Sequence, residues 1–288
     1  MTRILTRDDV AAVLDLRDCI DAVEAAFRNP VEARSLGVHG EWGTFHVKAA
    51  IADVFAAKIN ANFPDNPRAH ALPSIQGVIV LMDIHRGTPL AILDSTRITT
   101  LRTAAATAVA ARYLARKDAK TATIIGYGNV GRATAEALKL VREIETIHVC
   151  DLGDPIDDAV GESDIVAACT PSRTPILHRK HLHEGLFIAA TGADNPEKQE
   201  LAPDVLVQSR VVADVLEQAA TMGDLYHAIA AGVMTREDVH GELKDVLAGR
   251  GRTNEDEIFV FDSTGTALQD VAVASIAYAR AIERGMGM

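Results

Sequence analysis

The sequence contains few cysteines, and they are spread along the chain. Its 288 residues include three of them, Cys19, Cys150 and Cys169, and none forms a CxxC pair. An odd, widely spaced set does not indicate a disulfide framework, and zinc sites built on thiolates need closer spacing. We therefore expect no metal site, and we expect the three thiols to serve packing.

Basic residues are also in deficit. The 29 Lys and Arg residues oppose 40 Asp and Glu residues, which gives a net charge of −11, and the basic residues form no run. Nucleic acids are bound through clustered Lys and Arg, so we expect no nucleic-acid partner. No uncharged stretch is long enough to span a bilayer, and the N-terminal residues show no signal-peptide pattern. The prediction is a cytoplasmic protein with no membrane partner.

Apolar residues, by contrast, make up 48 % of the chain, enough for two domains or one large α/β unit. Their spacing predicts helices over 6–14 and 16–27, a polar loop after Pro30, strands over 43–49 and 54–60, and a β-hairpin of 75–83 and 89–94. A long helix over 99–115 leads into the second half. There, residues 225–246 and 266–282 are expected to be helical.

The stretch around residue 126 carries the strongest local signal. A β-branched apolar strand over 121–125 precedes a G-x-G-x-x-G motif, a helix and a second strand over 146–149 that ends at Asp151. Such glycines permit a tight turn and the close approach of a pyrophosphate. An acid about twenty residues after the glycines accepts the ribose hydroxyls of NAD and disfavours NADP. The expected cofactor contacts here are Gly126, Gly128, Asn129, Val130, Gly131 and Asp151. The alternative is a glycine-rich turn of another α/β protein, with Asp151 capping a loop.

The connection after Asp151 is short. Only 12 residues separate it from the strand that begins at Asp164, which leaves room for one short helix where a complete nucleotide-binding fold has a helix, a strand and another helix. Thr170 follows this strand, and Gly192 and Asp194 follow the next one. The carboxyl edge of an open α/β sheet is where ligands bind, so Thr170 is a candidate cofactor contact and Asp194 a candidate residue of the active site.

Several further stretches resemble one family. They are Ala57-Lys-Ile-Asn, Leu72-Pro-Ser-Ile-Gln-Gly, Ile98-Thr-Thr-Leu-Arg-Thr-Ala-Ala-Ala, Gly192-Ala-Asp-Asn-Pro-Glu-Lys-Gln-Glu-Leu, Val239-His and Phe261-Asp-Ser-Thr-Gly-Thr-Ala-Leu-Gln-Asp-Val-Ala. They are similar to the ornithine cyclodeaminase/μ-crystallin family, and the C-terminal half is most similar to its archaeal-type alanine dehydrogenase branch.

The resemblance implies an α/β fold with two domains in a homodimer. Residues 1–112 with 272–288 would form an α+β domain for substrate binding and dimerisation, and 113–271 a Rossmann-type parallel sheet that binds NAD, or less favourably NADP. Members of the family usually carry an additional helix and strand after the position of Asp151. We therefore expect a sheet shortened after its second strand and a more open adenine pocket.

Two basic residues are candidates for binding a substrate carboxylate. Arg102 matches the family's carboxylate motif, and a planar guanidinium holds a carboxylate through two hydrogen bonds. Lys58 lies in an apolar strand, where burial lowers the pKa of an amine and suits it to proton transfer. The alternatives are a surface ion pair for Arg102 and a solvated edge-strand position for Lys58.

The remaining candidates are less specific. The family resemblance gives Asp194 a role in amine chemistry, against the alternative of a loop acid that accepts backbone hydrogen bonds. Lys48 and His46 share a strand face, so both are candidates for the substrate site, although a lone strand His is more often structural. The resemblance alone implies that Ser263, Thr264 and Gly265 line the nicotinamide pocket; without it, these residues indicate a turn.

The predicted function is NAD(P)-dependent hydride transfer at the α-carbon of a small amino or imino acid. Lys58 and Asp194 would be catalytic, and Arg102, Lys58 and Lys48 would bind the substrate. An ornithine cyclodeaminase, which converts ornithine to proline and ammonia with the NAD retained, is one alternative. A non-catalytic ligand-binding or scaffold homologue is another. The sequence does not select among alanine, ornithine, pyrroline carboxylate and other imino acids.

Overall fold

The chain folds into two compact units. The structure is a computed structural model that describes residues 1–63, 65–151 and 153–288. Unit 1 comprises Met1–Arg102 and Thr266–Met288, and unit 2 comprises Thr103–Gly265. The assignment of substrate binding to one domain and NAD binding to the other, with the boundaries given above, stays a prediction.

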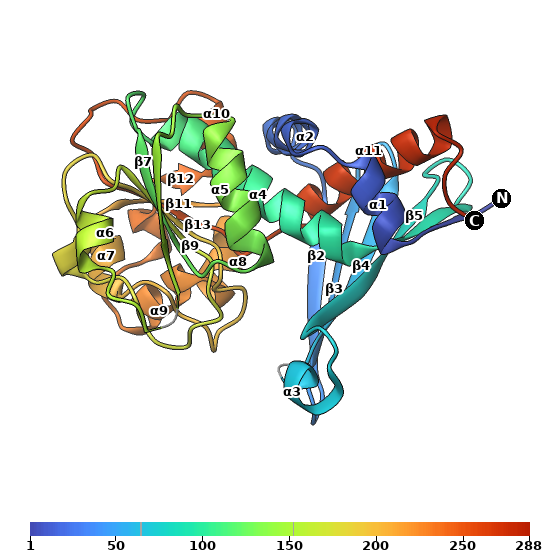
Figure 1. Cartoon of the computed structure of the whole chain (residues 1–288), viewed down its shortest axis with the longest axis horizontal. Coiled ribbons are helices and arrows are strands. Elements are labelled where there is room, and N and C mark those ends of the chain that lie inside the picture. The colour runs from blue at the N-terminus through green and yellow to red at the C-terminus, as the bar shows by residue number, and fades with distance from the viewer. Residues whose placement is uncertain (64, 152) are drawn as a thin grey trace. The chain divides into compact units, whose positions relative to one another are not determined.

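Unit 1 is built on a six-stranded sheet in the order β1-β6-β5-β4-β3-β2 (Figure 1). Its strands are β1 (Arg3–Leu5), β2 (Ala33–His39), β3 (Thr44–Ile51), β4 (Phe55–Asn62), β5 (Ile75–Met82) and β6 (Pro89–Asp94). β1 pairs in parallel with β6, and the other pairs are antiparallel. The predicted hairpin is confirmed as β5 and β6. The register places Lys48 opposite Lys58.

Helices cover one face of this sheet. They are α1 (Arg7–Val13), α2 (Leu16–Arg28), α11 (Ala267–Glu283) and the first part of α4 (Ser95–Leu114); the short α3 (Asn66–His70) lies in a loop. α11 contacts β2, β3, β4 and β5, and α1 and α2 pack against it. The last helix of the chain therefore completes the core that the first hundred residues begin.

The opposite face of the sheet is apolar and exposed. Successive strand residues point to opposite faces, so Ile59 faces away from α11 because its neighbour Lys58 faces toward it. The register continues this row from Leu36 through Val47 and Ile59 to Val78. We define the outer face by six side chains that are 37–60 % exposed: Leu36, Val38, Phe45, Ile59, Val78 and Ile92. Apolar patches of this kind commonly mark an interface.

Unit 2 contains a seven-stranded, entirely parallel sheet in the order β12-β11-β13-β10-β9-β7-β8. Its strands are β7 (Thr121–Ile125), β8 (Thr146–Cys150), β9 (Ile165–Ala168), β10 (Phe187–Ala190), β11 (Arg210–Ala213), β12 (Gly241–Glu242) and β13 (Phe259–Asp262). The predicted Rossmann-type sheet is confirmed, and so is its shortening, because β8 is the outermost strand on its side.

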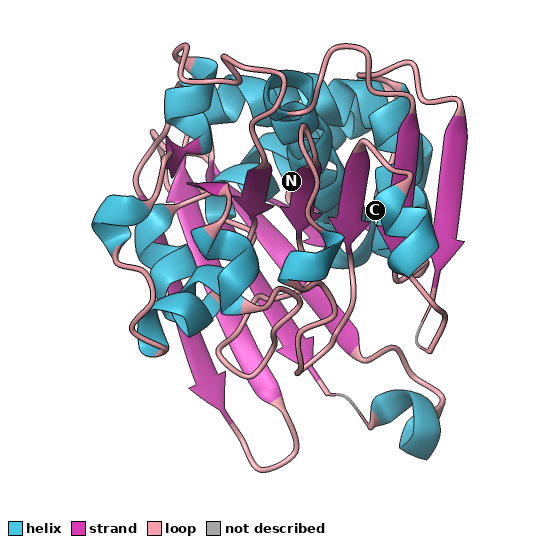
Figure 2. Cartoon of the chain, turned by 90° about the vertical axis from the view of Figure 1, so that its left-hand side faces the viewer, coloured by secondary structure: helices cyan, strands magenta, loops and turns pink. Residues whose placement is uncertain are grey.

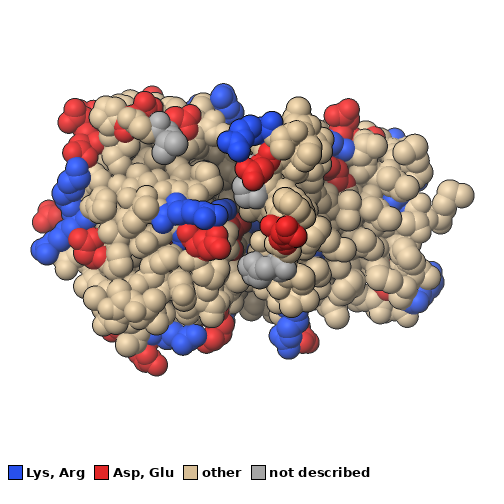
Figure 3. All heavy atoms as spheres, turned by 90° about the horizontal axis from the view of Figure 1, so that it is seen from below, with Lys and Arg blue, Asp and Glu red and all other residues tan. Residues whose placement is uncertain are grey.

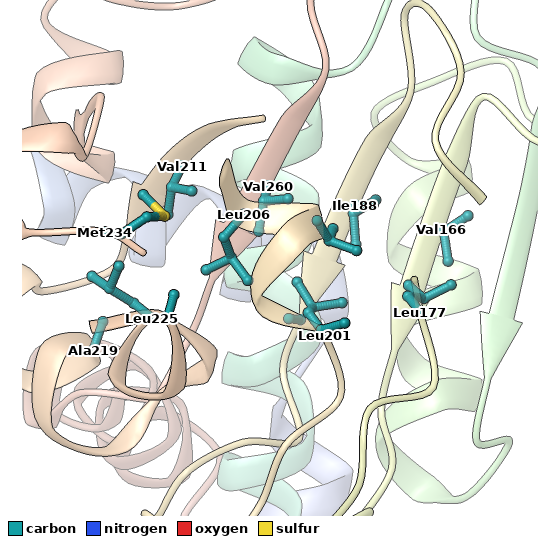
Figure 4. Close-up of a cluster of buried hydrophobic side chains, with 14 of the residues drawn as sticks. Val166, Leu177, Ile188, Leu201, Leu206, Val211, Ala219, Leu225, Met234 and Val260 are labelled. Carbon is teal, nitrogen blue, oxygen red and sulfur yellow. The ribbon is translucent and has the colours of Figure 1, made fainter. Parts of the chain in front are cut away.

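Helices lie on both faces of the parallel sheet, with α5 on one face and α6 and α7 on the other (Figure 1). Figure 2 shows the helices in cyan and the strands in magenta from the side of this unit. The helical segments are α5 (Asn129–Lys139), α6 (Asp157–Gly161), η1 (Arg179–His181), α7 (Pro203–Val207), α8 (Leu216–Met222), α9 (Asp224–Ala230), η2 (Arg236–Asp238) and α10 (Leu243–Leu247). Ile188 and Val260 on central strands face Leu201, Leu206 and Leu225 in a buried cluster (Figure 4). Burial on both faces explains why these strands are almost continuously apolar.

Two local predictions are wrong. The segment 225–246 is not one helix but α9, η2, β12 and the start of α10. Gly232 adopts a positive φ of 70° just after α9, a conformation that ends the helix there. The expected loop after Pro30 contains β2, an edge strand whose apolar residues Leu36 and Val38 alternate with polar ones and remain exposed in the single chain.

The surface of the described chain carries charges of both signs. On the face shown in Figure 3, acidic and basic side chains are interspersed among uncharged ones. Within the ranges that the structure describes, no helix combines the length and the apolarity needed to cross a membrane. The cytoplasmic location stays a prediction.

Candidate functional site

The glycine turn between β7 and α5 has the backbone geometry of a phosphate cradle. Gly126 has a φ of +89°, and a Cβ added at Gly131 would lie 2.1 Å from the carbonyl oxygen of Gly126, so no side chain fits there. A Cβ at Gly128 would meet no atom of the described residues within 4 Å. Gly128 is also the N-cap of α5 and provides no side-chain cap. The turn therefore leaves open space and helix N-terminal N–H groups for an anion.

Asp151 lies beside this turn. It follows β8 directly, is exposed, and its Oδ1 lies 3.4 Å from the backbone nitrogen of Tyr127. Asn129 and Val130 form the beginning of α5. The carboxylate and the turn are thus adjacent at the carboxyl edge of the sheet, as a ribose and a pyrophosphate require. The residues present fit NAD.

A buried glutamate ties two further edge loops together. Glu200 Oε1 accepts hydrogen bonds from the backbone nitrogen and the hydroxyl of Thr170, at 2.6 and 2.8 Å, and its Oε2 accepts one from the nitrogen of Gly192 at 2.7 Å. Burial raises the pKa of Glu200, and the hydrogen bonds from Thr170 and Gly192 oppose that shift. Sequence analysis missed Glu200, because a single acid in a loop gives no sign of burial.

A second acid organises the end of β13. Asp214 accepts hydrogen bonds from the hydroxyls of Ser263 and Thr264, at 3.3 and 3.0 Å, and from the nitrogen of Gly265 at 2.7 Å. Gly265 has a φ of +72°. The predicted nicotinamide residues therefore form one rigid turn, held by a carboxylate that was not among the candidates.

Asp194 lies in the loop after β10. Its Oδ1 accepts a hydrogen bond from Lys198 Nζ at 2.8 Å, and its side chain is 46 % exposed. The ammonium of Lys198 was not predicted. It gives Asp194 a charged partner within its own loop, while the remaining exposure leaves the carboxylate accessible.

In unit 1, three ionic side chains meet in the core between β4, α4 and α11. Lys58 Nζ lies 2.7 Å from both carboxylate oxygens of Asp270, and Arg102 Nε donates to Asp270 Oδ1 at 3.1 Å. Lys58 and Asp270 are 2 % exposed and Arg102 is 7 % exposed. The structure thus brings the predicted residues Lys58 and Arg102 together on one acid that sequence analysis did not select.

This cluster has an excess of positive charge. Burial lowers the pKa of Lys58 to about 7; Asp270 opposes that shift, and the nearby charges of Arg102 and Lys48 add to it. Burial acts to raise the pKa of Asp270, but the attraction of Lys58 and Arg102 outweighs it, and the pKa is lowered. While Lys58 is protonated, two buried cations therefore share one carboxylate. A second anion would be attracted to this cluster.

Gln269 adds a donor to the cluster. Its Oε1 accepts a hydrogen bond from Arg102 Nη1 at 2.9 Å. Because a guanidinium only donates, this contact fixes the orientation of the amide and directs Nε2 elsewhere. Nε2 is buried, and no group among the described residues accepts a hydrogen bond from it. A buried donor of this kind is costly unless a ligand or water accepts from it.

Asp270 and Gln269 are the main residues that sequence reasoning missed in unit 1. The signal was present in Leu-Gln-Asp-Val-Ala, where two polar residues interrupt an apolar helix. His46 and Lys48 lie on the Lys58 face of the sheet and are half-buried.

The cysteines are not part of a metal site in the described structure. Cys19, Cys150 and Cys169 are free thiols, and the first two are buried. Among residues 1–63, 65–151 and 153–288, no three His, Cys, Asp or Glu side chains are grouped so that they could hold a metal ion.

Comparison with known proteins identifies the family. The ornithine cyclodeaminase/mu-crystallin family model matches residues 1–157 and 154–285. The chain belongs to this family. The resemblance predicted from the motifs is confirmed. Within the curated relatives, alanine dehydrogenase of Archaeoglobus fulgidus is 34 % identical over 314 aligned positions, which cover 99 % of this chain and 97 % of the relative.

Solved structures of the family have the same fold. An archaeal alanine dehydrogenase dimer with bound NAD superposes with a TM-score of 0.96 at 34 % identity, covering 100 % of this chain and 98 % of that one. The Δ1-pyrroline-2-carboxylate reductase of Thermococcus litoralis, in complex with NADH and L-proline, gives a TM-score of 0.96 at 30 % identity, with coverages of 100 % and 99 %.

Proposed function

We propose that this family member is an NAD-dependent oxidoreductase that transfers a hydride between nicotinamide and the α-carbon of a small amino or imino acid. The observation that carries the proposal is the cluster of Lys58, Arg102 and Asp270, whose surplus positive charge is suited to a substrate carboxylate. The similarity to an alanine dehydrogenase and to a pyrroline-carboxylate reductase supports the same class of reaction.

Arg102 and Lys58 hold the substrate carboxylate in this proposal. Arg102 donates one hydrogen bond from Nε to Asp270 and one from Nη1 to Gln269. These two contacts fix the plane of the guanidinium, and its other N–H groups can donate to a substrate carboxylate. Gln269 Nε2 supplies another donor nearby. Lys48, on the same sheet face, adds positive charge.

Lys58 also exchanges the proton on the substrate nitrogen. With its pKa lowered to about 7 by burial, both the protonated and the neutral amine are populated near neutral pH. Asp270 holds Nζ in place and favours its protonated form. Asp194 is the second candidate for proton exchange, since its carboxylate is half-exposed and paired with Lys198.

Unit 2 holds NAD in this proposal. The turn of Gly126, Gly128 and Gly131 takes the pyrophosphate, with Asn129 and Val130 in the first turn of α5, and Asp151 accepts the ribose hydroxyls. The loops carrying Thr170, Ser263 and Gly265 contact the nicotinamide half. When bound, the nicotinamide supplies or accepts the hydride; the protein supplies binding and orientation.

The first experiment is a titration of the purified protein with NADH and NADPH, followed by nicotinamide fluorescence. We expect NADH to bind more tightly, because Asp151 repels a 2′-phosphate. Amino and imino acids are then screened with NAD and NADH. Arg102→Ala should abolish turnover by weakening substrate binding, and the exposed Arg86→Ala is the matched control. Unchanged turnover in Arg102→Ala would contradict the assignment.

The same screen distinguishes the alternatives. Release of ammonia from a diamino acid without net NADH formation would identify a cyclodeaminase. Binding of cofactor without turnover of any substrate would leave a ligand-binding protein, and binding of neither NADH nor NADPH would leave a scaffold.

The outer face of unit 1 is the proposed dimer interface. Its six apolar side chains lie on five strands and are exposed in the single chain, and a related alanine dehydrogenase is a dimer. A second copy of this chain would cover them. Sedimentation analysis should give a dimer for the natural chain and a monomer for Ile59→Asp. A dimer of unchanged affinity in Ile59→Asp would exclude this face.

A further inference from the structure

We propose that this chain binds NAD without recognising the adenine base, which lies against a Tyr127–Arg132 pair at the open edge of the parallel sheet. This inference rests on the proposed function and deepens it. It names the class of cofactor that the site accepts: a nicotinamide dinucleotide whose second base is not selected.

The topology of unit 2 provides the first observation. A dinucleotide-binding sheet of the 3-2-1-4-5-6 order has two mononucleotide-binding halves, and in the first half a third strand lies beyond the second. Here β7 leads into the glycine turn and β8 leads into Asp151, so they match strands 1 and 2. β8 is the outermost strand, and α6 alone separates it from β9 among the described elements. The half that holds the adenylate is thus two strands wide.

The family match also changes in the connection between β8 and β9. The family model matches in two segments, 1–157 and 154–285, which meet in the connection between β8 and β9. The alignment with the A. fulgidus alanine dehydrogenase spans 314 positions, although this chain has 288 residues. Relatives therefore contain residues that have no counterpart here, and the family match is interrupted on the adenylate side.

A planar surface is present at this edge. Tyr127 lies between Gly126 and Gly128, and the guanidinium carbon of Arg132 lies 4.6 Å from the centre of its ring. The backbone nitrogen of Tyr127 is 3.4 Å from Asp151 Oδ1, so the pair adjoins the proposed ribose contact. Arg132 is exposed.

The chemistry of such a surface explains the lack of selection. Aromatic rings and guanidinium planes stack on any nucleobase, because every base has a π-face, whereas selection requires hydrogen bonds to the edge of the base. With β8 at the sheet edge, the contacts proposed for a dinucleotide among the described residues are the pyrophosphate turn, Asp151 and the loops at the nicotinamide half. None of these distinguishes one base from another.

The test compares NADH with reduced nicotinamide cytosine dinucleotide, which keeps the nicotinamide, both riboses and the pyrophosphate but carries a pyrimidine. Binding is followed by nicotinamide fluorescence. We expect the two dissociation constants to agree within about threefold, as for stacking without base selection. An NADH affinity about tenfold higher or more would overturn the inference and leave the proposed function standing. Binding of neither compound would instead refute the proposed function.

Two variants test the stacking pair. Arg132→Ala should weaken both dinucleotides to a similar extent, by about fivefold or more, the loss expected when a stacking partner is removed. Lys139→Ala, at the exposed far end of the same helix, is the matched control and should leave both affinities unchanged. Unchanged affinities in Arg132→Ala, or a loss confined to NADH, would overturn the assignment of the pair.

Discussion

Asp270 is the residue whose replacement tests the buried cluster most directly. Asp270→Asn keeps the shape of the side chain and removes the charge that Lys58 and Arg102 share. At an effective dielectric constant of about 20, a unit charge at about 3 Å contributes on the order of 5 kcal/mol. Relaxation reduces the loss, and breaking a buried ion pair costs about 3–5 kcal/mol. We expect the free energy of unfolding of Asp270→Asn to fall by that amount.

The loss should depend on pH. Folding lowers the pKa of Lys58 from 10.5 to about 7, so the unfolded chain binds more protons between these values, and the stability of the natural chain rises with pH across this window. Asp270 stabilises protonated Lys58, and its replacement lowers the pKa of Lys58 further. The difference between variant and natural chain should therefore grow as the pH falls through about 7.

Urea unfolding of both proteins at about pH 6 and about pH 8.5 measures this difference. Asp118→Asn, which breaks an exposed pair with Arg116, is the control and should cost at most about 1 kcal/mol. A loss in Asp270→Asn no larger than in this control, at both pH values, would refute the account of a shared buried carboxylate.

Three further predictions concern the cofactor and the proton. Gly131→Ala should lower both thermal stability and NADH affinity, because its Cβ would lie 2.1 Å from a backbone oxygen. Gly128→Ala, with open space around its Cβ among the described residues, should fold normally and lose only NADH affinity. A Gly128→Ala protein with full NADH affinity would contradict the assignment of this turn to the pyrophosphate. Glu200→Gln should weaken NADH binding and lower the free energy of unfolding in urea by about 1–3 kcal/mol, because the backbone N–H of Thr170 or of Gly192 loses its acceptor. Glu217→Gln, at an exposed position, is the control and should change neither quantity. In the reductive direction, kcat/KM should fall as the pH rises through about 7, where Lys58 loses its proton; a flat profile there would remove Lys58 from proton exchange.

Local order in the chain predicted the region from β7 to β8 in unit 2 well. The apolar strand, the three glycines, the helix and the acid after the next strand are contiguous, so their geometry follows from backbone preferences over about thirty residues. The shortened sheet was predicted for the same reason, since 12 residues between Asp151 and the next strand leave no room for the additional elements. The helix boundaries in 225–246 were not predicted, because tertiary packing divides a segment that is helical in pattern.

The sequence by itself determined the two sheet types, the glycine turn and its acid, and, through family motifs, Lys58 and Arg102 as candidates. Only the tertiary structure decided what those candidates contact. Asp270 is 212 residues from Lys58 and 168 from Arg102 along the chain, and packing of α11 on β4 brings the three together. Burial of Glu200 against two loops was decided in the same way. Pairing between distant residues and the desolvation that shifts their pKa values arise from packing, which local sequence patterns do not encode.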